Sequence, residues 1–318
     1  MECNGLFSFL VVIKEAFQIL PKNGKLMALV TIFSLLLTEI TFAAFGFSII
    51  GLAQDMASAA KSLVPDPSSF DPTSFDPSKL QDQLRHIQQI VAILYAVEIA
   101  FILVFLVISF ITTMATILVA AVSRVGNTLS IKNLFSRVAG TWKKPFLTSI
   151  YAAIQALGLL AVPGIFAVPV FMYPNVVTVL IAVLFAAVVF LIFYLYLMVI
   201  WELAIVVSVL EEGCYGMVAM GKASELVKGQ RLKGYMLNLS FLLLSLILFA
   251  IYQVIYRLKG PSSAIICGLF LVGFSYLVKI LQVVAYTVLY FHCKKQHGEM
   301  PEIDIGVAKY ELLPKTYT

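Results

Sequence analysis

The chain has 318 residues, of which 61% are hydrophobic and only 12% are charged, whereas a soluble domain is roughly 45–50% apolar and about 25% charged. This composition excludes a water-soluble globular protein. Lysine and arginine outnumber aspartate and glutamate by 22 to 17. The resulting net charge of +5 is too small for a nucleic-acid-binding protein without a basic cluster. The function is therefore expected in or at a membrane.

The chain begins with a predicted amphipathic helix over residues 5–20. Its apolar residues recur at helical spacing: Leu6, Phe9, Leu10, Ile13, Phe17 and Leu20. Pro21 ends this helix, and a basic turn with Lys22 and Lys25 follows. Lys14 and Glu15 interrupt the apolar run and no small-residue cleavage site follows it, so a cleavable signal peptide is not expected.

Six segments are apolar over the roughly 20 residues that a helix needs to cross about 30 Å of hydrocarbon. Their predicted ranges are 26–52, 88–122, 146–168, 176–210, 235–256 and 262–291. The predicted fold class is therefore all-α, a polytopic membrane bundle of six transmembrane helices. Six spans place both termini on one side, where sixteen Lys and Arg residues then lie, against five in the opposite loops. The positive-inside rule predicts that this side is the cytosol.

The loop between the first two spans, residues 54–87, has a water-soluble composition. Asp-Pro pairs recur in it every five residues, at Asp66-Pro67, Asp71-Pro72 and Asp76-Pro77. Each proline interrupts a continuous helix. The three carboxylates could bind calcium weakly, but the spacing and the glycine of an EF-hand loop are absent. A solvated acidic loop is expected.

The amphipathic helix recurs before the third and the fifth span, over residues 130–142 and 214–228. The two apolar stripes are Ile131, Leu134, Phe135, Val138 and Trp142, and then Met217, Met220, Ala223, Leu226 and Val227. The chain is thus predicted to hold three units, each an interfacial helix, a basic turn and a two-span hairpin. Such a helix lies in the headgroup layer with its apolar face towards the lipid.

Basic residues accompany the second and third interfacial helices and form a predicted lipid or partner face. They are Arg137, Lys143, Lys144, Lys222, Lys228, Arg231 and Lys233. Lysine and arginine near an anionic membrane surface contribute about 1 kcal/mol each. Two interpretations stay open: the helices only brace the bundle, or their basic face recognises membrane lipids or a cytosolic protein partner.

Ionisable residues within a span are costly and indicate a functional position. The predicted spans hold four: Glu39, Glu98, Glu202 and Lys279. At 1.5 Å per residue from the inner ends, Glu39 at about 20 Å matches Lys279 at about 18 Å best, and Glu202 at about 12 Å comes second. One interpretation is a Glu–Lys pair that holds two spans in register. The other is a proton or ion relay, with Gln155 and Gln282 as neighbours.

Catalytic and metal-binding patterns are absent from the sequence. It contains no His-Glu-x-x-His, no Gly-x-Ser-x-Gly and no phosphate-binding glycine loop. Zinc would lack ligands, because Cys293, His292 and His297 are too few. We therefore expect a protein that is not an enzyme and that needs no cofactor or metal.

Residues 201–229 carry the pattern by which the chain resembles a plant family of largely uncharacterised six-span membrane proteins. The pattern is Trp201-Glu202-Leu203-Ala204-Ile205-Val206-Val207-Ser208-Val209-Leu210-Glu211-Glu212, then Gly216, Ala219-Met220, Lys222-Ala223, Glu225-Leu226 and Lys228-Gly229. More distantly, the chain is similar to the membrane domain attached to some bacterial glycerophosphodiester phosphodiesterases, whose catalytic domain has no counterpart here. The resemblance implies the architecture and supplies no catalytic residue.

The same pattern predicts how the chain leaves the membrane after the fourth span. Gly213 and Gly216 permit a sharp turn there. Glu211 and Glu212 stand at a helix C-terminus, where negative charge opposes the helix dipole. A basic partner such as Arg231 or Lys233 is therefore expected.

Residues 294–318 form a predicted hydrophilic cytosolic tail. Tyr310 and Leu313 in it fit the Tyr-x-x-apolar sorting motif that vesicle-coat adaptors bind. As a whole, the sequence predicts a non-catalytic membrane organiser or adaptor of the endomembrane system or plasma membrane, with a basic cytosolic face. The alternative is a transporter or channel that uses Glu39, Glu202 and Lys279.

Overall fold

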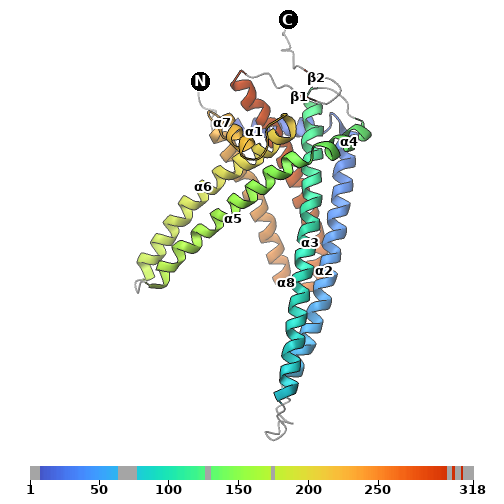
Figure 1. Ribbon diagram of the computed structural model, residues 1–318, viewed down its shortest axis with the longest axis vertical. Helices are drawn as coiled ribbons and strands as arrows, with labels where there is room; N and C mark the ends of the chain where they lie inside the picture. Colours follow the sequence, from blue (N-terminus) through green and yellow to red (C-terminus); the bar gives the residue numbers. More distant parts are fainter. Residues whose placement is uncertain are drawn as a thin grey trace. The chain divides into compact units, whose positions relative to one another are not determined.

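The computed structural model is almost entirely helical, which confirms the all-α class (Figure 1). It describes residues 8–63, 77–125, 130–172, 176–298, 303–304 and 309–310. The elements are α1 (Ser8–Ile19), α2 (Gly24–Leu63), α3 (Pro77–Val125), α4 (Ile131–Thr141), α5 (Lys143–Met172), α6 (Val176–Leu210), α7 (Met217–Leu226), α8 (Arg231–Gln296), β1 (Ile303–Asp304) and β2 (Lys309–Tyr310).

Among the described residues, five helical segments are long and apolar enough to cross a membrane, and the chain is a multi-pass membrane protein. They are Gly24–Ala59, Leu84–Arg124, Val179–Leu210, Arg231–Leu258 and Ile266–Gln296. These segments contain most of the first, second, fourth, fifth and sixth predicted spans. The remaining predicted span, 146–168, is helical throughout and lies within α5.

The helices α2 and α3 continue into the region predicted as an acidic loop. The loop prediction was wrong for residues 54–63 and 77–87, which are helical. The first stretch contains three alanines, and the second contains two glutamines, two leucines, a lysine and an arginine; these residue types favour a helix even in water. Pro77 is the first residue of α3, a position where its missing N–H costs nothing. The other Asp-Pro residues, 66–76, lie outside the described residues.

The chain divides into two compact units. Unit 1 comprises Met1–Ile32, Ile111–Ile251 and Ser275–Thr318, and unit 2 comprises Phe33–Phe110 and Tyr252–Phe274. The helices α2, α3 and α8 contribute residues to both units.

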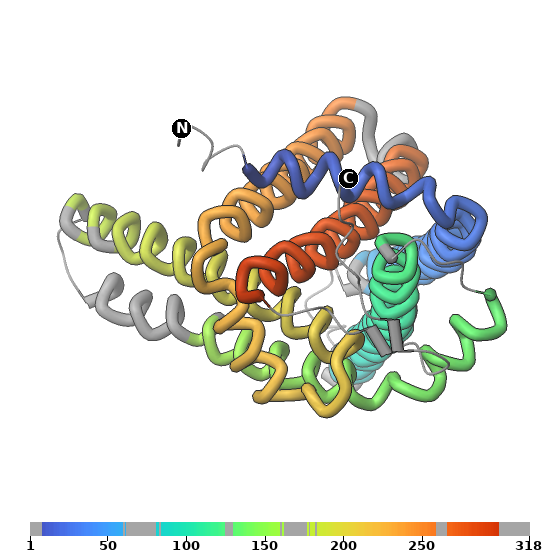
Figure 2. Tube along the Cα trace, turned by 90° about the horizontal axis from the view of Figure 1, so that it is seen from above, coloured from blue at the N-terminus to red at the C-terminus, as the bar shows by residue number. Residues whose placement is uncertain are grey.

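The helix α8 folds back on itself. In unit 1 the Tyr286 hydroxyl donates a 2.5 Å hydrogen bond to Asn238 Oδ1, although a straight helix would separate these residues by about 72 Å. In unit 2 the Tyr252 ring lies 3.5 Å from where a Cβ on Gly268 would stand. The chain therefore reverses between Tyr252 and Gly268, and Figure 2 shows the two limbs side by side. These two limbs correspond to the third predicted hairpin, formed by the fifth and sixth predicted spans at 235–256 and 262–291.

Unit 1 has an apolar core where α3, α6 and α8 converge. Its fully buried side chains include Met114, Ile117, Leu203, Val206 and Leu289. Figure 1 shows α5 and α6 as an antiparallel pair, and α6 is also packed by α7. Elsewhere the long helices expose large apolar side chains, as helices do whose outer faces are covered by lipid.

Candidate functional site

Three short helices lie at one end of unit 1 (Figure 1). They are α1, α4 and α7, and they correspond to the helices predicted at 5–20, 130–142 and 214–228. We call this region, with the turns that follow each short helix, the charged end of unit 1. Two charge clusters and two exposed apolar faces define it.

The first cluster is centred on Glu211, directly after α6. Its Oε2 lies 2.6 Å from Lys222 Nζ on α7, and its Oε1 lies 3.0 Å from Lys294 Nζ on α8. The Tyr290 hydroxyl donates a 2.7 Å hydrogen bond to Oε1. The side chains of Glu211 and Lys294 are only 8% and 7% exposed. The cluster therefore joins α6, α7 and α8 through one buried carboxylate.

Burial and hydrogen bonding act on Glu211 in opposite directions. Burial raises its pKa, but the hydrogen bonds from Lys222, Tyr290 and Lys294 outweigh this and hold the pKa below its ordinary value of 4.5. The expected partners Arg231 and Lys233 were wrong, since Lys222 and Lys294 make the ion pairs. The C-terminal turns of α8 lie beside the end of α6. This contact joins residues far apart in the sequence, so the residues that directly follow Glu211 could not predict it.

The second cluster joins α1, α3 and α8 through Glu15. Arg124 Nη2 lies 2.8 Å from Glu15 Oε1, and His292 Nε2 lies 2.6 Å from Glu15 Oε2. The Arg124 guanidinium also stands 5.0 Å from the centre of the Phe291 ring. The hydrogen bond from His292 lowers the pKa of Glu15, with help from Arg124, against the effect of burial. Sequence reasoning missed this cluster.

The turn into α7 is as sharp as predicted. Gly213 and Gly216 have positive φ angles of 78° and 60°. The Gly216 N–H donates a 2.8 Å hydrogen bond to Thr148 Oγ1 on α5. Burial and the nearby Glu211 carboxylate raise the pKa of Cys214 in the same turn, so its thiol is not activated.

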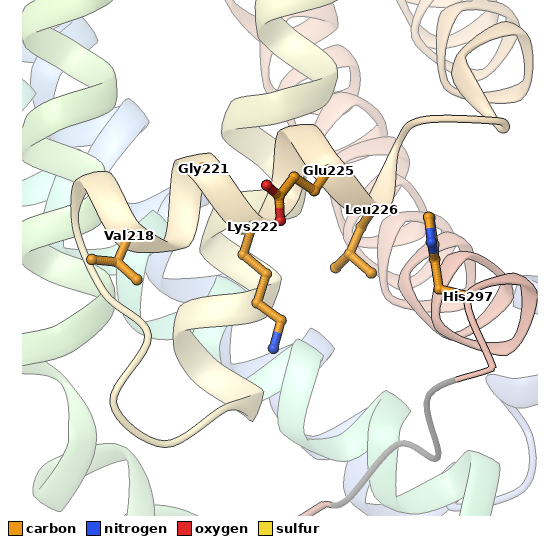
Figure 3. Close-up of a pocket in the computed structure, with 6 residues that line it drawn as sticks. All are labelled: Val218, Gly221, Lys222, Glu225, Leu226 and His297. Atoms are coloured by element: carbon orange, nitrogen blue, oxygen red, sulfur yellow. The ribbon is translucent and has the colours of Figure 1, made fainter.

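Most of the predicted apolar face of α7 is turned into unit 1, although Met217 at its start is exposed. Met220, Ala223 and Leu226 are buried inside unit 1, where the small residues Ala219 and Ala223 allow close packing. A pocket of about 390 Å³ opens beside α7, lined by Val218, Gly221, Lys222, Glu225, Leu226 and His297 (Figure 3). Figure 3 shows the Lys222 ammonium directed away from Glu225, which agrees with its ion pair to Glu211.

The helix α4 is the opposite case. Ile131, Phe135 and Trp142 are 48%, 55% and 43% exposed, and they fall on one face. Leu134 is the side chain by which α4 is anchored in unit 1. The helix α1 also has one buried and one exposed apolar face. Val12, Ala16 and Ile19 are buried, while Leu10 and Phe17 are exposed.

The predicted basic residues are distributed over the charged end of unit 1. Arg137 lies on α4, Lys143 and Lys144 begin α5, Lys222 lies on α7, Lys228 follows α7, and Arg231 and Lys233 begin α8. Arg231 stands 5.7 Å from the centre of the Tyr196 ring. Within the part of the chain that the structure describes, Lys132, Lys143, Lys144, Lys228 and Lys233 make no ion pair.

Among the charges in the spans, Lys279 pairs with Glu202. Depth counting ranks Glu202 second, after Glu39, as the partner of Lys279. Lys279 Nζ lies 2.8 Å from Glu202 Oε1, and Gln282 Nε2 donates a 3.4 Å hydrogen bond to the same oxygen. Gln155 is not part of this group, since it accepts a 2.8 Å hydrogen bond from Trp201. Glu39 belongs to unit 2, and Glu98 is exposed.

The predicted sorting motif is only partly described. Tyr310 lies in β2, which pairs antiparallel with β1 and places Tyr310 opposite Ile303. Leu313 lies outside the described residues.

Residues 3–308 match a family model described as Domain of unknown function (DUF8558). No curated protein and no solved structure matches the chain.

Proposed function

The chain belongs to the DUF8558 family, and for this member we propose a non-catalytic role as a membrane organiser or adaptor. In this proposal the charged end of unit 1 is a cytosolic surface that binds anionic lipid or a protein partner. The proposal includes six spans, in which α5 is added to the five segments given above, and it places both termini in the cytosol. It places the protein in the endomembrane system or the plasma membrane, without a cofactor or metal.

The observation that carries the proposal is the exposed face of α4. Ile131, Phe135 and Trp142 form an apolar stripe on it, and a helix with such a stripe is stable in the headgroup layer of a membrane. Lys132, Lys143 and Lys144 accompany the stripe and are not used in ion pairs within the described residues. Each of them adds about 1 kcal/mol near an anionic surface.

The two charge clusters support the same role. Glu15 and Glu211 engage Arg124, Lys222 and Lys294, so these ion pairs hold α1 and α7 to the long helices. The lysines of α4 and of the first turn of α5 are left for an external anion. A membrane organiser needs both features: ion pairs that fix its helices in place, and separate basic residues that contact the membrane or a partner.

Trp142 provides the test, because the only other tryptophan, Trp201, is buried. The full chain is reconstituted in vesicles of increasing anionic lipid content, and Trp142 is read as the difference between wild type and Trp142→Phe. We expect quenching by brominated lipid to increase with anionic lipid. The triple change of Lys132, Lys143 and Lys144 to Gln abolishes this dependence, and the same change to Arg preserves it. The proposal would be contradicted if an aqueous quencher reached Trp142 equally in wild type and in both triple variants at every anionic lipid content.

Adaptor binding by the tail is a separate part of the proposal, supported by the Tyr310–Leu313 motif alone. Tyr310→Ala should change the steady-state location of the protein in cells, and Tyr317→Ala should not. An unchanged location of Tyr310→Ala removes this part.

The alternative function, a transporter or channel, is favoured by the Glu202–Lys279 pair with Gln282. It predicts a solute or proton flux in proteoliposomes that Glu202→Gln and Lys279→Met abolish without unfolding the protein. If no flux appears, the pair is a structural link between α6 and α8.

A further inference from the structure

The second carboxyl group in the spans, Glu39, has a different environment from Glu202. It lies on α2 within unit 2, together with the part of α8 that contains Gly273. Glu39 Oε1 is 2.6 Å from where a Cβ on Gly273 would stand. The Glu39 carboxyl group thus occupies the space beside the backbone of α8 that a Cβ on residue 273 would fill; we call this space the seat, and a Cβ there would displace the carboxyl group.

Glu39 Oε2 is buried and has no hydrogen-bond partner among the described residues. The hydroxyl of the preceding residue, Thr38, is also buried and unpartnered there. Leu35 is the other side chain near the seat. The Oε2 atom is thus buried without a cation or donor beside it, while the Glu39 residue as a whole is partly exposed.

The remaining ionisable side chains of unit 2 do not supply that cation. On α2 the nearest charged residues are Lys25, which belongs to unit 1, and Asp55, fourteen and sixteen residues or roughly 21 and 24 Å along the helix. On α3 the only charged residue between 87 and 110 is Glu98, which is exposed. On α8 the described groups are Tyr252, Tyr256, Arg257 and Cys267, and no ion pair or hydrogen bond joins any of them to Glu39.

An isolated ionised carboxylate in hydrocarbon carries a desolvation cost of several kcal/mol. The group must therefore hold a neutralising cation. We propose that Glu39, seated against Gly273, is an intramembrane binding site for a proton or a small monovalent metal cation. Glu202, which has Lys279 as its permanent counter-ion, is not such a site. The inference is independent of the lipid-binding surface and requires no net transport.

A lipophilic carbodiimide distinguishes the two carboxyl groups. The acid form adds across one C=N bond: the carboxyl oxygen bonds to the central carbon, the proton moves to nitrogen, and an acyl shift from oxygen to nitrogen gives a stable N-acylurea. In low-salt detergent solution at neutral pH, peptide mass spectrometry should find the adduct on Glu39. Glu202, whose Oε1 is held by Lys279 Nζ at 2.8 Å, should react far less. Glu39→Gln should lose the adduct.

The same experiment separates the two cations. If the site holds a proton alone, only alkaline pH slows the labelling. If it also takes a metal cation, sodium or potassium chloride slows the labelling at constant pH, and choline chloride does not. An infrared difference spectrum between wild type and Glu39→Gln reports the carbonyl stretch of a carboxylic acid without needing reagent access. Absence of both the adduct and this band, or equal labelling of Glu39 and Glu202, overturns the proposal.

Two glycines of α8 provide matched variants. Gly273→Ala places a methyl group at the seat and should change the labelling rate of Glu39 several-fold. Gly268→Ala should not change it, because a Cβ there meets only Tyr252 and Phe42, at 3.5 Å and 3.7 Å. Wild-type labelling in Gly273→Ala would overturn the role of Gly273 in the site.

Discussion

The buried carboxylate of Glu211 accepts hydrogen bonds from the ammonium groups of Lys222 and Lys294 and from the Tyr290 hydroxyl. Removing one partner from such a buried pair costs about 3–5 kcal/mol, because the other charge stays buried. Glu211→Gln is therefore expected to lower the free energy of unfolding by about 3 kcal/mol. Unfolding of the purified protein in detergent measures this. Glu212→Gln is the matched control, since Glu212 is exposed and should change stability by less than about 0.5 kcal/mol.

The same residue makes stability depend on pH in a defined direction. The pKa of Glu211 is lower in the folded protein than its ordinary value of 4.5. Its contribution is therefore complete above that value and is lost as the pH falls through the folded pKa. The stability difference between wild type and Glu211→Gln should be constant from about pH 7 to pH 5 and should shrink below about pH 4.5. A difference that grows on acidification contradicts this assignment.

At the scale of elements, the turn from α6 into α7 contains two glycines with positive φ, and Gly216 is the one that also lies against another helix. Gly216 has φ 60° and ψ −132°, and a Cβ on it would stand 3.1 Å from the Tyr151 ring. Gly216→Ala should therefore destabilise the protein by about 1–3 kcal/mol. Gly221→Ala, inside α7 with nothing within 4 Å of the new Cβ, should stabilise it by up to about 1 kcal/mol. Thermal unfolding of both variants tests this, and an equal shift would refute the role given to Gly216.

The sequence predicted which segments are helical more reliably than which helical faces are buried. Long apolar runs and the 3.6-residue period are local properties, so α1, α4, α7 and the apolar spans could be found from them. The burial of Met220 and Leu226 on α7 could not, because an apolar stripe suits a protein neighbour as well as lipid. The lengths of α2 and α3 were underestimated for a related reason: helix propensity continues past the point where hydrophobicity ends.

At the scale of the whole molecule, pairing across the chain was the hardest feature to predict. Glu15 and His292 are 277 residues apart, and nothing local marks them as partners. Depth counting favoured Glu39 for Lys279 because it treats the spans as parallel rods that start at one level. In the structure Lys279 Nζ instead lies 2.8 Å from Glu202 Oε1, a pairing that equal starting levels do not predict.

The number of crossings decides whether α4 and α7 can belong to one cytosolic surface. Lys132 and Lys228 flank the α5–α6 hairpin, so they lie on the same side if both helices cross and on opposite sides if only α6 does. In a chain whose native cysteines are replaced by Ser, we expect Lys132→Cys and Lys228→Cys to react with an impermeant thiol reagent from the cytosolic side of sealed vesicles. Asp82→Cys, near the start of α3, should react only from the other side. If Lys132→Cys and Lys228→Cys react from opposite sides, α5 is not a span. The lysines around α4 and those after α7 then face different compartments, and the lipid-binding surface is reduced to one of the two groups.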